Sequence, residues 1–417
     1  MLIVEAKLKG KDEQFRLVDS AIRAVQFVRN KALRFWMDRQ GKSQYDLNKY
    51  CAVLAREFEW AKKLNSQARQ AAAERAWSAI ARFFDNCKKA ISGKKGYPKF
   101  QKDNRSVEYK TSGWKLSTDC KVITFTDGFG IGSFKLIGSR DLNFYSPNQI
   151  KRVRIVRRAD GYYCQFCIAV ERNIVTEPTG RTIGIDLGLK YFLKGSDGQA
   201  VENPQCLRKS EQAIKRLQRR VSRKQKGSKN RIKARKRLAK KHLQVSRRRK
   251  DFAVKTARTL ILSHDLIAYE DLQVRNMVRN RSLAKSISDA SWSVFVEWLK
   301  YFGQVFGKIV VPVPPQYTSQ DCANCGYRVP KTLSTRTHAC PKCGYSECRD
   351  VNAARVILQK GLKLASEKYP RAVGNLTLGE SLTATLSNEN CLKQVISLNQ
   401  ESPHLEVGEC QLSPQPR

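Results

Sequence analysis

The spacing of apolar residues along the chain divides it into stretches of different predicted structure. Residues 1–9 alternate apolar and polar side chains, which predicts a single β-strand. From about residue 13 to residue 91, apolar positions recur at helical spacing, as in Ile22, Val25 and Val28. We therefore expect a long helical segment directly after the first strand.

A second group of strands follows the helical segment. A break rich in glycine and lysine at residues 92–98 ends the helical pattern. The strands predicted after it are residues 122–125, 132–136, 153–156 and 162–170. Ala159-Asp160-Gly161, between the last two, predicts a hairpin turn. These patterns predict a small β-barrel domain of residues 1–12 and 93–178, into which a helical lobe of residues 13–92 is inserted.

Three acidic residues after residue 180 stand in an apolar strand or where a strand or a helix begins or ends. Asp186 interrupts the apolar run at residues 182–187, Glu270 ends the run that starts at Leu266, and Asp350 precedes a helical pattern. A carboxylate in a buried strand is costly unless a cation or another partner satisfies it. Each acid alone is compatible with a surface carboxylate or a helix cap. An RNase H-like α/β sheet would bring all three together.

If the three carboxylates meet, they form a site for two divalent cations. Hard oxygen ligands suit Mg²⁺ or Mn²⁺, and two such ions about 3.5–4 Å apart can promote phosphodiester hydrolysis. We expect Asp186 to bridge the ions, with Glu270 and Asp350 each completing one of them. Asp271 could replace Glu270 on sequence grounds, although strand alternation points it to the opposite face. The catalytic and magnesium-binding candidates are therefore Asp186, Glu270 and Asp350.

Four cysteines have the spacing of a zinc ribbon. Cys322 and Cys325 form one CxxC pair followed by glycine, and Cys340 and Cys343 form a second. The 14 residues between the pairs are slightly fewer than a ribbon usually has, but four thiolates at this spacing can surround one tetrahedral Zn²⁺. The alternative is a pair of redox-active CxxC motifs or unrelated thiols. We expect a structural zinc ribbon over residues 318–346, inserted just before the third acid.

The charge of the chain indicates a polyanionic partner. Its 79 Lys and Arg exceed its 37 Asp and Glu, giving a formal net charge of +42. Residues 208–250 alone contain 21 Lys and Arg and one acid. Apolar residues at near-helical spacing predict basic helices there, with a break at Gly227-Ser228, and binding to phosphates best explains their charge density. The candidate nucleic-acid-binding residues are Arg216, Arg219, Arg220, Arg223, Lys224, Arg231, Arg235 and Arg237.

Several other features narrow the class of protein. No apolar run reaches the roughly 18 uncharged residues that suggest a membrane span, so we expect none. The first residues lack the pattern of a signal peptide, and 13 cysteines without such a signal favour a reducing cytoplasm or nucleoid. Residues 371–417 have a net charge of −2, from three basic residues and five Glu, and are rich in Ser, Asn, Gln and Pro. We expect a disordered tail there.

Sequence motifs in the second half of the chain resemble those of the TnpB family, the transposon-encoded relatives of type V CRISPR effectors. In chain order they are Gly184-Ile185-Asp186-Leu187-Gly188, Tyr269-Glu270-Asp271-Leu272, the two CxxCG knuckles at Cys322 and Cys340, and Arg349-Asp350-Val351-Asn352-Ala353-Ala354. The resemblance covers about residues 181–360 and is specific as a combination. The first half of the chain agrees with the family in layout only. One departure from the pattern is Cys348, which we expect to be a passive thiol.

The resemblance implies an α+β multidomain protein. Residues 181–317 and 347–368 would form a RuvC-like nuclease domain with the three acids as its catalytic residues. The basic segment of residues 208–250 would be a bridging helical element, and the zinc ribbon would be an insertion that binds target nucleic acid. The β-barrel would be the wedge domain, and its helical insert the recognition lobe.

The resemblance also implies partners and an activity. A protein of this family would bind a guide RNA from its transposon end and cut double-stranded target DNA beside a short adjacent motif. We expect a monomer, although the sequence does not determine the oligomeric state. Base pairing would select the sequence, while the protein would recognise duplex shape and the short motif.

Two other functions are compatible with the same composition. One is a transposase, or its accessory, that joins DNA strands itself, although no His-hydrophobe-His motif or candidate covalent tyrosine supports it. The other is a nuclease-silent, RNA-guided repressor, which the complete set of three acids argues against.

Overall fold

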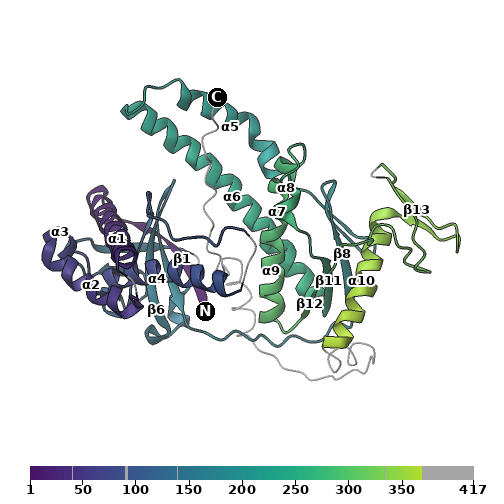
Figure 1. The fold of residues 1–417 in the computed structure, drawn as a ribbon, viewed down its shortest axis with the longest axis horizontal. Helices are drawn as coiled ribbons and strands as arrows, with labels where there is room; N and C mark the ends of the chain where they lie inside the picture. Colours follow the sequence, from purple (N-terminus) through teal and green to yellow (C-terminus); the bar gives the residue numbers. More distant parts are fainter. Residues whose placement is uncertain (40, 90–92, 139, 333, 369–417) are drawn as a thin grey trace. The chain divides into compact units, whose positions relative to one another are not determined.

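The computed structural model describes residues 1–39, 41–89, 93–138, 140–332 and 334–368. The described chain divides into two compact units, with the boundary between Glu171 and Arg172. Figure 1 shows the helices and strands of both units. The disordered tail predicted for residues 371–417 lies outside the described residues.

Unit 1 combines an antiparallel sheet with a helical segment. Its strands are β1 (Leu2–Lys9), β2 (Ser106–Tyr109), β3 (Trp114–Leu116), β4 (Val122–Phe125), β5 (Gly132–Ile137), β6 (Ile150–Arg158) and β7 (Gly161–Ile168). Its helices are α1 (Asp12–Asp38), α2 (Gln44–Glu57), α3 (Glu59–Lys62) and α4 (Ser66–Lys88). The helices lie in the sequence between β1 and β2, as the helical spacing predicts. The short strands β2 and β3 have no counterpart in the prediction.

The sheet of unit 1 is a half-barrel that stays open between its two end strands, so the predicted β-barrel is present in part. Its seven strands have the order β2-β6-β7-β1-β5-β4-β3, so β1 is central and β2 and β3 are the two ends. All of these pairings are antiparallel. Arg75 of α4 donates to Ser106 at 3.2 Å and forms an ion pair with Glu108 at 3.4 Å, both on β2. The helical insert therefore covers the β2 edge, where barrel closure would require another strand.

The helices and the sheet of unit 1 share one hydrophobic core. Ile22 and Val25 of α1 belong to the same buried cluster as Phe134 of β5 and Phe166 of β7. The stripe predicted from the sequence is thus the face that α1 buries against this core. Because the insert has no separate core, it folds together with the sheet.

A buried ionic cluster also joins the helices of unit 1 to the sheet. Glu108 is only 4% exposed and pairs with Arg75, Arg152 and Arg154. Burial alone would raise the pKa of Glu108, but the guanidinium groups around it lower that pKa to about 2. The carboxylate is therefore ionised and fully paired, as a buried charge must be.

Unit 2 is built around a mixed sheet. Its strands are β8 (Thr182–Leu187), β9 (Tyr191–Gly195), β10 (Ala200–Glu202), β11 (Leu266–Glu270) and β12 (Ile309–Val313), and a separate hairpin is formed by β13 (Thr337–Ala339) and β14 (Ser346–Cys348). Its helices are α5 (Cys206–Ser222), α6 (Lys229–Ser263), α7 (Val274–Met277), α8 (Ala284–Ala290), α9 (Trp292–Val305) and α10 (Arg349–Lys368). The main sheet has the order β10-β9-β8-β11-β12, in which β8, β11 and β12 are parallel.

Alternate residues of β8 and β11 face different helices. Ile183 and Ile185 of β8, with Ile267 of β11, belong to the core formed with α6 and α9. On the other face, Ala268 of β11 belongs to a smaller core that includes Ile357 of α10. Because side chains alternate along a strand, every second residue of β8 and β11 points toward α10.

Two glycines allow α10 to lie unusually close to this sheet. A Cβ atom on Gly184 of β8 would lie 2.1 Å from the Ala354 carbonyl oxygen and 2.6 Å from the Leu358 nitrogen, both on α10. A Cβ atom on Gly361 of α10 would lie 2.3 Å from the Cβ of Ala268. The helix therefore touches the sheet through positions that carry no side chain.

Within the described part of the chain, none of the helices has both the length and the apolar character that crossing a membrane requires.

The close approach at Gly184 leads to a first prediction. Gly184→Ala places a methyl group against α10 backbone, which cannot move aside cheaply, and we expect unit 2 to lose about 3 kcal/mol of stability. Hydrogen exchange of the β8 and α10 amides measures this loss directly. Gly138→Ala is the matched control, because a Cβ there meets its nearest atom at an ordinary 3.5 Å. If the β8 and α10 amides were equally protected from hydrogen exchange in the two variants, the packing argument would be wrong.

Candidate functional site

The fold places the three predicted acids on one side of the main sheet of unit 2. In the parallel register, Tyr269 of β11 pairs with Ile185 of β8, so Glu270 and Asp186 occupy the next positions at the carboxyl ends of the two strands. Asp186 is two residues beyond Gly184, and Glu270 is two residues beyond Ala268. Both acids therefore project from the face that α10 covers. The third acid, Asp350, lies in the first turn of α10.

The charges of these acids affect one another. Burial raises the pKa of Asp186 to about 7, and the carboxylates of Glu270 and Asp350 contribute to the increase. The positive charge of Arg349 opposes it only in part. Burial also raises the pKa of Glu270, which is 9% exposed and accepts a hydrogen bond from the Thr318 hydroxyl. Negative charge is therefore crowded at this edge of the sheet.

Asp350 has a cationic neighbour inside the protein. The Arg349 guanidinium donates to one oxygen of Asp350, Oδ1, from Nε at 3.1 Å and from Nη2 at 3.0 Å. Its third nitrogen, Nη1, donates to the Thr335 carbonyl oxygen at 3.0 Å. One side chain thus connects the acid at the start of α10 to the loop between the two CxxC pairs.

The donor set at this edge fits a hard divalent cation. The three groups are carboxylates, and burial together with the charges of Glu270 and Asp350 raises the pKa of Asp186 despite the nearby Arg349. Among the described residues, only the four cysteines bring three or more metal-binding atoms within 4.8 Å of one another. The three carboxylates therefore lie near each other but more loosely than the cysteine sulfur atoms do.

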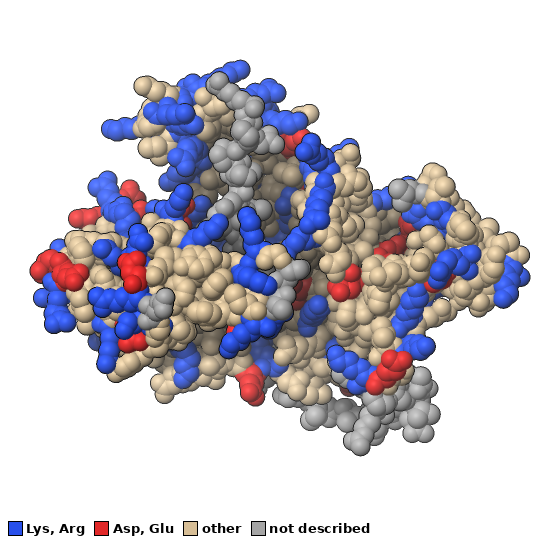
Figure 2. Space-filling view, viewed as in Figure 1, with Lys and Arg blue, Asp and Glu red and all other residues tan. Residues whose placement is uncertain are grey.

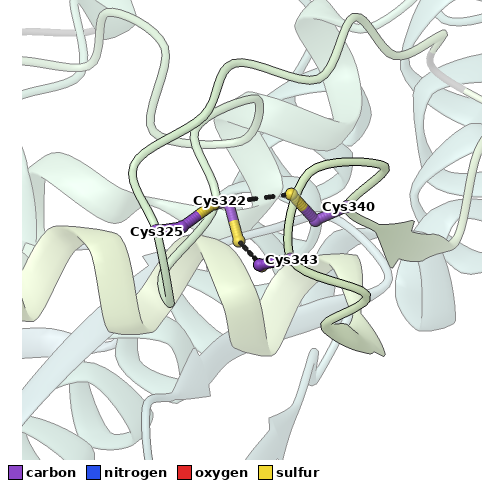
Figure 3. Close-up of side chains that lie close together, drawn as sticks. All are labelled: Cys322, Cys325, Cys340 and Cys343. Carbon is purple, nitrogen blue, oxygen red and sulfur yellow. Dashed lines mark hydrogen bonds between the residues drawn. The ribbon is translucent and has the colours of Figure 1, made fainter.

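The four predicted zinc ligands do come together (Figure 3). The sulfur atoms of Cys322 and Cys343 are 3.8 Å apart, and those of Cys325 and Cys340 are 3.6 Å apart. Four sulfur atoms at about 2.3 Å from one zinc ion would be separated by about 3.8 Å. A disulfide would instead bring two sulfur atoms to about 2 Å. The arrangement therefore fits a tetrahedral metal site and not a pair of disulfides.

Each CxxC pair is held in the same turn. The amide of Cys322 donates to the Tyr327 carbonyl, and the amide of Cys340 donates to the Tyr345 carbonyl, each at 2.9 Å. The glycine that follows each pair has a positive φ, 72° in one turn and 71° in the other. Glycine adopts this backbone conformation without strain, which explains the CxxCG pattern in both knuckles.

Two polar residues that the sequence analysis did not single out tie the ribbon to the acids. Asn352 of α10 is fully buried, accepts from the Ala323 amide at 3.0 Å and donates to the Asp321 carbonyl at 2.8 Å. Thr318 is 2% exposed and donates to Glu270. Asn352 belongs to the motif around Asp350, and Thr318 lies four residues before Cys322. Their unusual feature, a buried polar side chain, becomes visible only in the fold.

The basic segment forms a helical hairpin of α5 and α6. The helices end and begin around the expected break, where Gly227 has a φ of 86° and the Ser228 side chain caps α6. The helical region is longer than predicted, because α6 continues to Ser263. The last turns of α6 belong to the hydrophobic core that it forms with α9 and the main sheet. Asp289 accepts hydrogen bonds from two amides in the first turn of α5, which fixes the base of the hairpin.

The eight basic candidates lie along this hairpin. All are exposed except Arg231, which is half-buried. Figure 2 shows Lys and Arg gathered over the hairpin in the upper part of the view. Among the ion pairs of the described residues, the only acid within the segment, Glu211, pairs with Lys215 and Lys285 and with none of the eight candidates. Their charges are therefore available to an external anion.

Two family models match the second half of the chain. Residues 165–281 match OrfB of IS605, described as a probable transposase, and residues 292–357 match the TNB domain of Cas12f1-like proteins. The first match contains Asp186, Glu270 and the basic hairpin. The second contains the four cysteines and Asp350.

Similar curated proteins extend the comparison to most of the chain. A proposed RNA-guided DNA endonuclease of Streptomyces pristinaespiralis is 29% identical over 84% of this chain and 87% of its own length. A second protein with this proposed activity, InsQ of Escherichia coli strain K12, is 28% identical over 81% of this chain and 87% of its own length. The TnpB-like protein L79 of Acanthamoeba polyphaga mimivirus is 31% identical over 33% of this chain and 27% of its own length.

One solved structure supports the fold. The Cas12f1 chain of a Cas12f1–sgRNA–target DNA complex matches with a TM-score of 0.50 and 14% identity, over 83% of this chain and 81% of that chain. The fold is thus a mixed α/β arrangement of the type found in Cas12 effectors, and the family models place the chain among transposon-encoded proteins. Together, the two family models and the curated relatives support assignment of the chain to the TnpB family.

The cysteine geometry leads to a second prediction. The purified protein should contain one zinc ion per chain, and Cys322→Ser should remove most of it, because a three-thiolate site with an added hydroxyl binds zinc more weakly. Elemental analysis by mass spectrometry measures the content. Cys348→Ser is the control, since Cys348 lies close in sequence but outside the group of four sulfur atoms. Unchanged zinc in the Cys322 variant would show that these thiols do not form the site.

Proposed function

We propose that this protein is an RNA-guided DNA endonuclease of a transposon, which hydrolyses phosphodiester bonds in target DNA next to a short transposon-adjacent motif. The family supports this proposal, as do two relatives for which the same activity is proposed and which align over most of this chain. The observation that carries it most directly is the position of the three acids. Asp186, Glu270 and Asp350 come from separate elements and lie near one another on the side of the sheet that α10 covers.

The nuclease domain in this proposal is RuvC-like and comprises residues 181–317 and 347–368. Its support is the strand order, in which three parallel strands, β8, β11 and β12, continue into an antiparallel pair, β9 and β10. This is the order expected of an RNase H-like sheet. The carboxyl ends of β8 and β11 then place Asp186 and Glu270 side by side, where ligands of open α/β sheets commonly bind.

Asp186, Glu270 and Asp350 are the residues that would hold two Mg²⁺ or Mn²⁺ ions. When bound, such a pair of ions activates a water molecule and stabilises the departing oxygen of the phosphodiester. The protein supplies the orientation: Thr318 fixes one oxygen of Glu270, and Arg349 fixes one oxygen of Asp350. Asp271 points away from this cluster and is exposed, so it has no part in the proposed site.

The remaining elements would handle nucleic acid. The basic hairpin within residues 208–250 would bind the phosphates of the guide RNA and its target, because its eight candidate cations have no acidic partners among the described residues. The zinc ribbon of residues 318–346 would hold target DNA beside the acids. In unit 1, the half-barrel would serve as the wedge domain and the helices of residues 13–92 as the recognition lobe.

The main alternative is an RNA-guided DNA-binding protein that does not cut. The same basic hairpin and ribbon would support that function equally well. The acids distinguish the two, because a protein that only binds DNA has no use for three carboxylates grouped at one buried edge of a sheet, where burial and the neighbouring carboxylates raise the pKa of Asp186. A role as a transposition accessory would likewise leave these acids without a purpose.

A third prediction tests the proposed catalysis. Asp186→Ala should reduce cleavage of a guide-matched DNA duplex by at least about a thousandfold. Where several residues act together at one site, removing one of them costs the enzyme most of its activity. Binding of guide RNA and target should remain, because the substitution lies away from the basic hairpin. Both can be measured on the complex purified with its native transposon RNA.

Asp271→Ala is the matched control for this experiment. Asp271 neighbours Glu270 but is exposed, so its loss should leave cleavage within about twofold of the original rate. If Asp186→Ala cuts normally, Asp186 is not catalytic and the proposed site is wrong. If the unmodified protein binds guide RNA and target DNA but never cuts the DNA, it is instead an RNA-guided DNA-binding protein without nuclease activity.

A fourth prediction concerns the hairpin. The double variant Arg219→Ala with Arg220→Ala should bind guide RNA about tenfold or more weakly, and the slope of log affinity against log salt should fall by about 2, one for each phosphate that the variant no longer neutralises. Fluorescence anisotropy over a salt series gives both numbers. Lys215→Ala is the control, because Lys215 is already paired with Glu211 at 2.9 Å. An unchanged slope in the double variant would exclude these arginines from RNA binding.

A further inference from the structure

Tyr317 stands out at the start of the zinc ribbon because its backbone is in the left-handed region. Its φ is 63°, a conformation that only four non-glycine residues adopt in the described chain. A bulky side chain is strained there, whereas glycine is not. The backbone has a clear role, since the Tyr317 carbonyl accepts from the amides of Gln320 and Asp321 at 3.0 and 2.9 Å. Glycine would make the same turn without strain, so the turn does not explain the tyrosine ring.

The ring of Tyr317 forms one side of an exposed stack. The Arg328 guanidinium lies over it, 3.5 Å from the ring centroid, while Tyr317 remains 50% exposed. Arg328 is oriented by one hydrogen bond, from Nε to Asp321 at 3.0 Å, and its side chain is also 50% exposed. The other nitrogens of this guanidinium have no acceptor among the described residues. An aromatic face and an oriented cation are thus presented together to solvent.

This stack adjoins the proposed catalytic acids. Thr318, the residue after Tyr317, donates to Glu270. Lys360 of α10 donates to the Gln316 carbonyl at 3.1 Å and to Asp321 at 3.1 Å, so it closes the other side of the same turn. Arg328 and Lys360 share a single acid, Asp321, which leaves one positive charge in excess. The aromatic face of Tyr317 and one excess positive charge therefore belong to the same backbone turn as Thr318, which binds Glu270 at the end of β11.

We propose that Tyr317 and Arg328 form a binding site for an unpaired nucleotide of the DNA strand that enters the acid cluster. The base stacks on the exposed face of the pair, and the adjoining phosphate binds Arg328 and Lys360. Every base has a π-face, so the site is indifferent to sequence and selects a single strand over a duplex. The inference rests on the proposed function and specifies how that function's substrate strand is held beside Glu270.

The geometry accounts for the strained tyrosine. A stacking ring contributes more to binding if it is held in place before the nucleotide arrives. The ring of Tyr317 remains half exposed, and the Arg328 guanidinium stacked over it favours one orientation. Strain that serves binding is a recurrent property of functional sites.

The test uses the full-length protein and a single-stranded oligodeoxynucleotide that carries one 2-aminopurine, whose fluorescence falls when it stacks. With the original protein, fluorescence should be quenched on binding. Tyr317→Ala should abolish the quenching and weaken binding at moderate salt by about tenfold, while Tyr317→Phe should retain both. Tyr327→Ala is the matched control, because Tyr327 is a ribbon tyrosine of similar exposure, 44%, and has no stacked arginine among the described residues.

Tyr317→Gly separates a binding role from a structural one. Glycine relieves the backbone strain, so the unfolding temperature should stay the same or rise while quenching is lost. A clear fall in unfolding temperature would show that the ring serves folding and would overturn the proposal. Normal quenching in the Ala and Gly variants would overturn it as well, by showing that the nucleotide stacks elsewhere.

The Asp186→Ala variant distinguishes this inference from the proposed function. If the stack binds the strand, quenching should persist in Asp186→Ala and disappear when Tyr317→Gly is added to it. If Asp186→Ala still cuts DNA, the catalytic assignment fails, yet loss of quenching in Tyr317→Gly would still support the stack. If Asp186→Ala stops cutting and Tyr317→Gly quenches normally, the catalytic assignment stands and the stack is refuted.

Discussion

The arrangement of unit 2 depends on the close contact between α10 and the sheet, which two glycines make possible. Gly184 and Gly361 leave no room for a side chain at the two closest points. Because this contact fixes the height of α10 above β8 and β11, it also fixes Asp350 relative to Asp186 and Glu270. A small change in packing at either glycine would therefore separate charges that must lie near one another.

The sequence predicted those parts of the molecule whose chemistry is local. The two CxxCG knuckles, the break at Gly227 and the hairpin turn before β7 each depend on a few adjacent residues, and the structure contains all three. The acids could be recognised because a carboxylate in an apolar run is unusual. Their grouping on one face also follows from strand alternation once the register of β8 and β11 is known. Register between distant strands is a property of the whole sheet and cannot be read from either strand alone.

The parts that sequence reasoning missed depend on tertiary contacts. Strands β2 and β3 are short, and their apolar residues are too few to form a pattern. The open side of the half-barrel could not be predicted, because no local signal shows that α4 covers the β2 edge. Asn352 and Thr318 look like ordinary polar residues in the sequence. Only burial, a result of the complete fold, reveals them as the connections between the ribbon and the acids.

The shared core of unit 1 limits how this part of the protein can be exchanged with relatives. Ile22 and Val25 are buried with Phe134 and Phe166, and Glu108 is neutralised in part by an arginine from α4. A chimaera that transplants only the helices would expose the sheet's apolar face and leave a buried carboxylate without one of its cations. Successful grafts would have to carry both partners, so natural variation in the helices should be accompanied by matched variation in the strands.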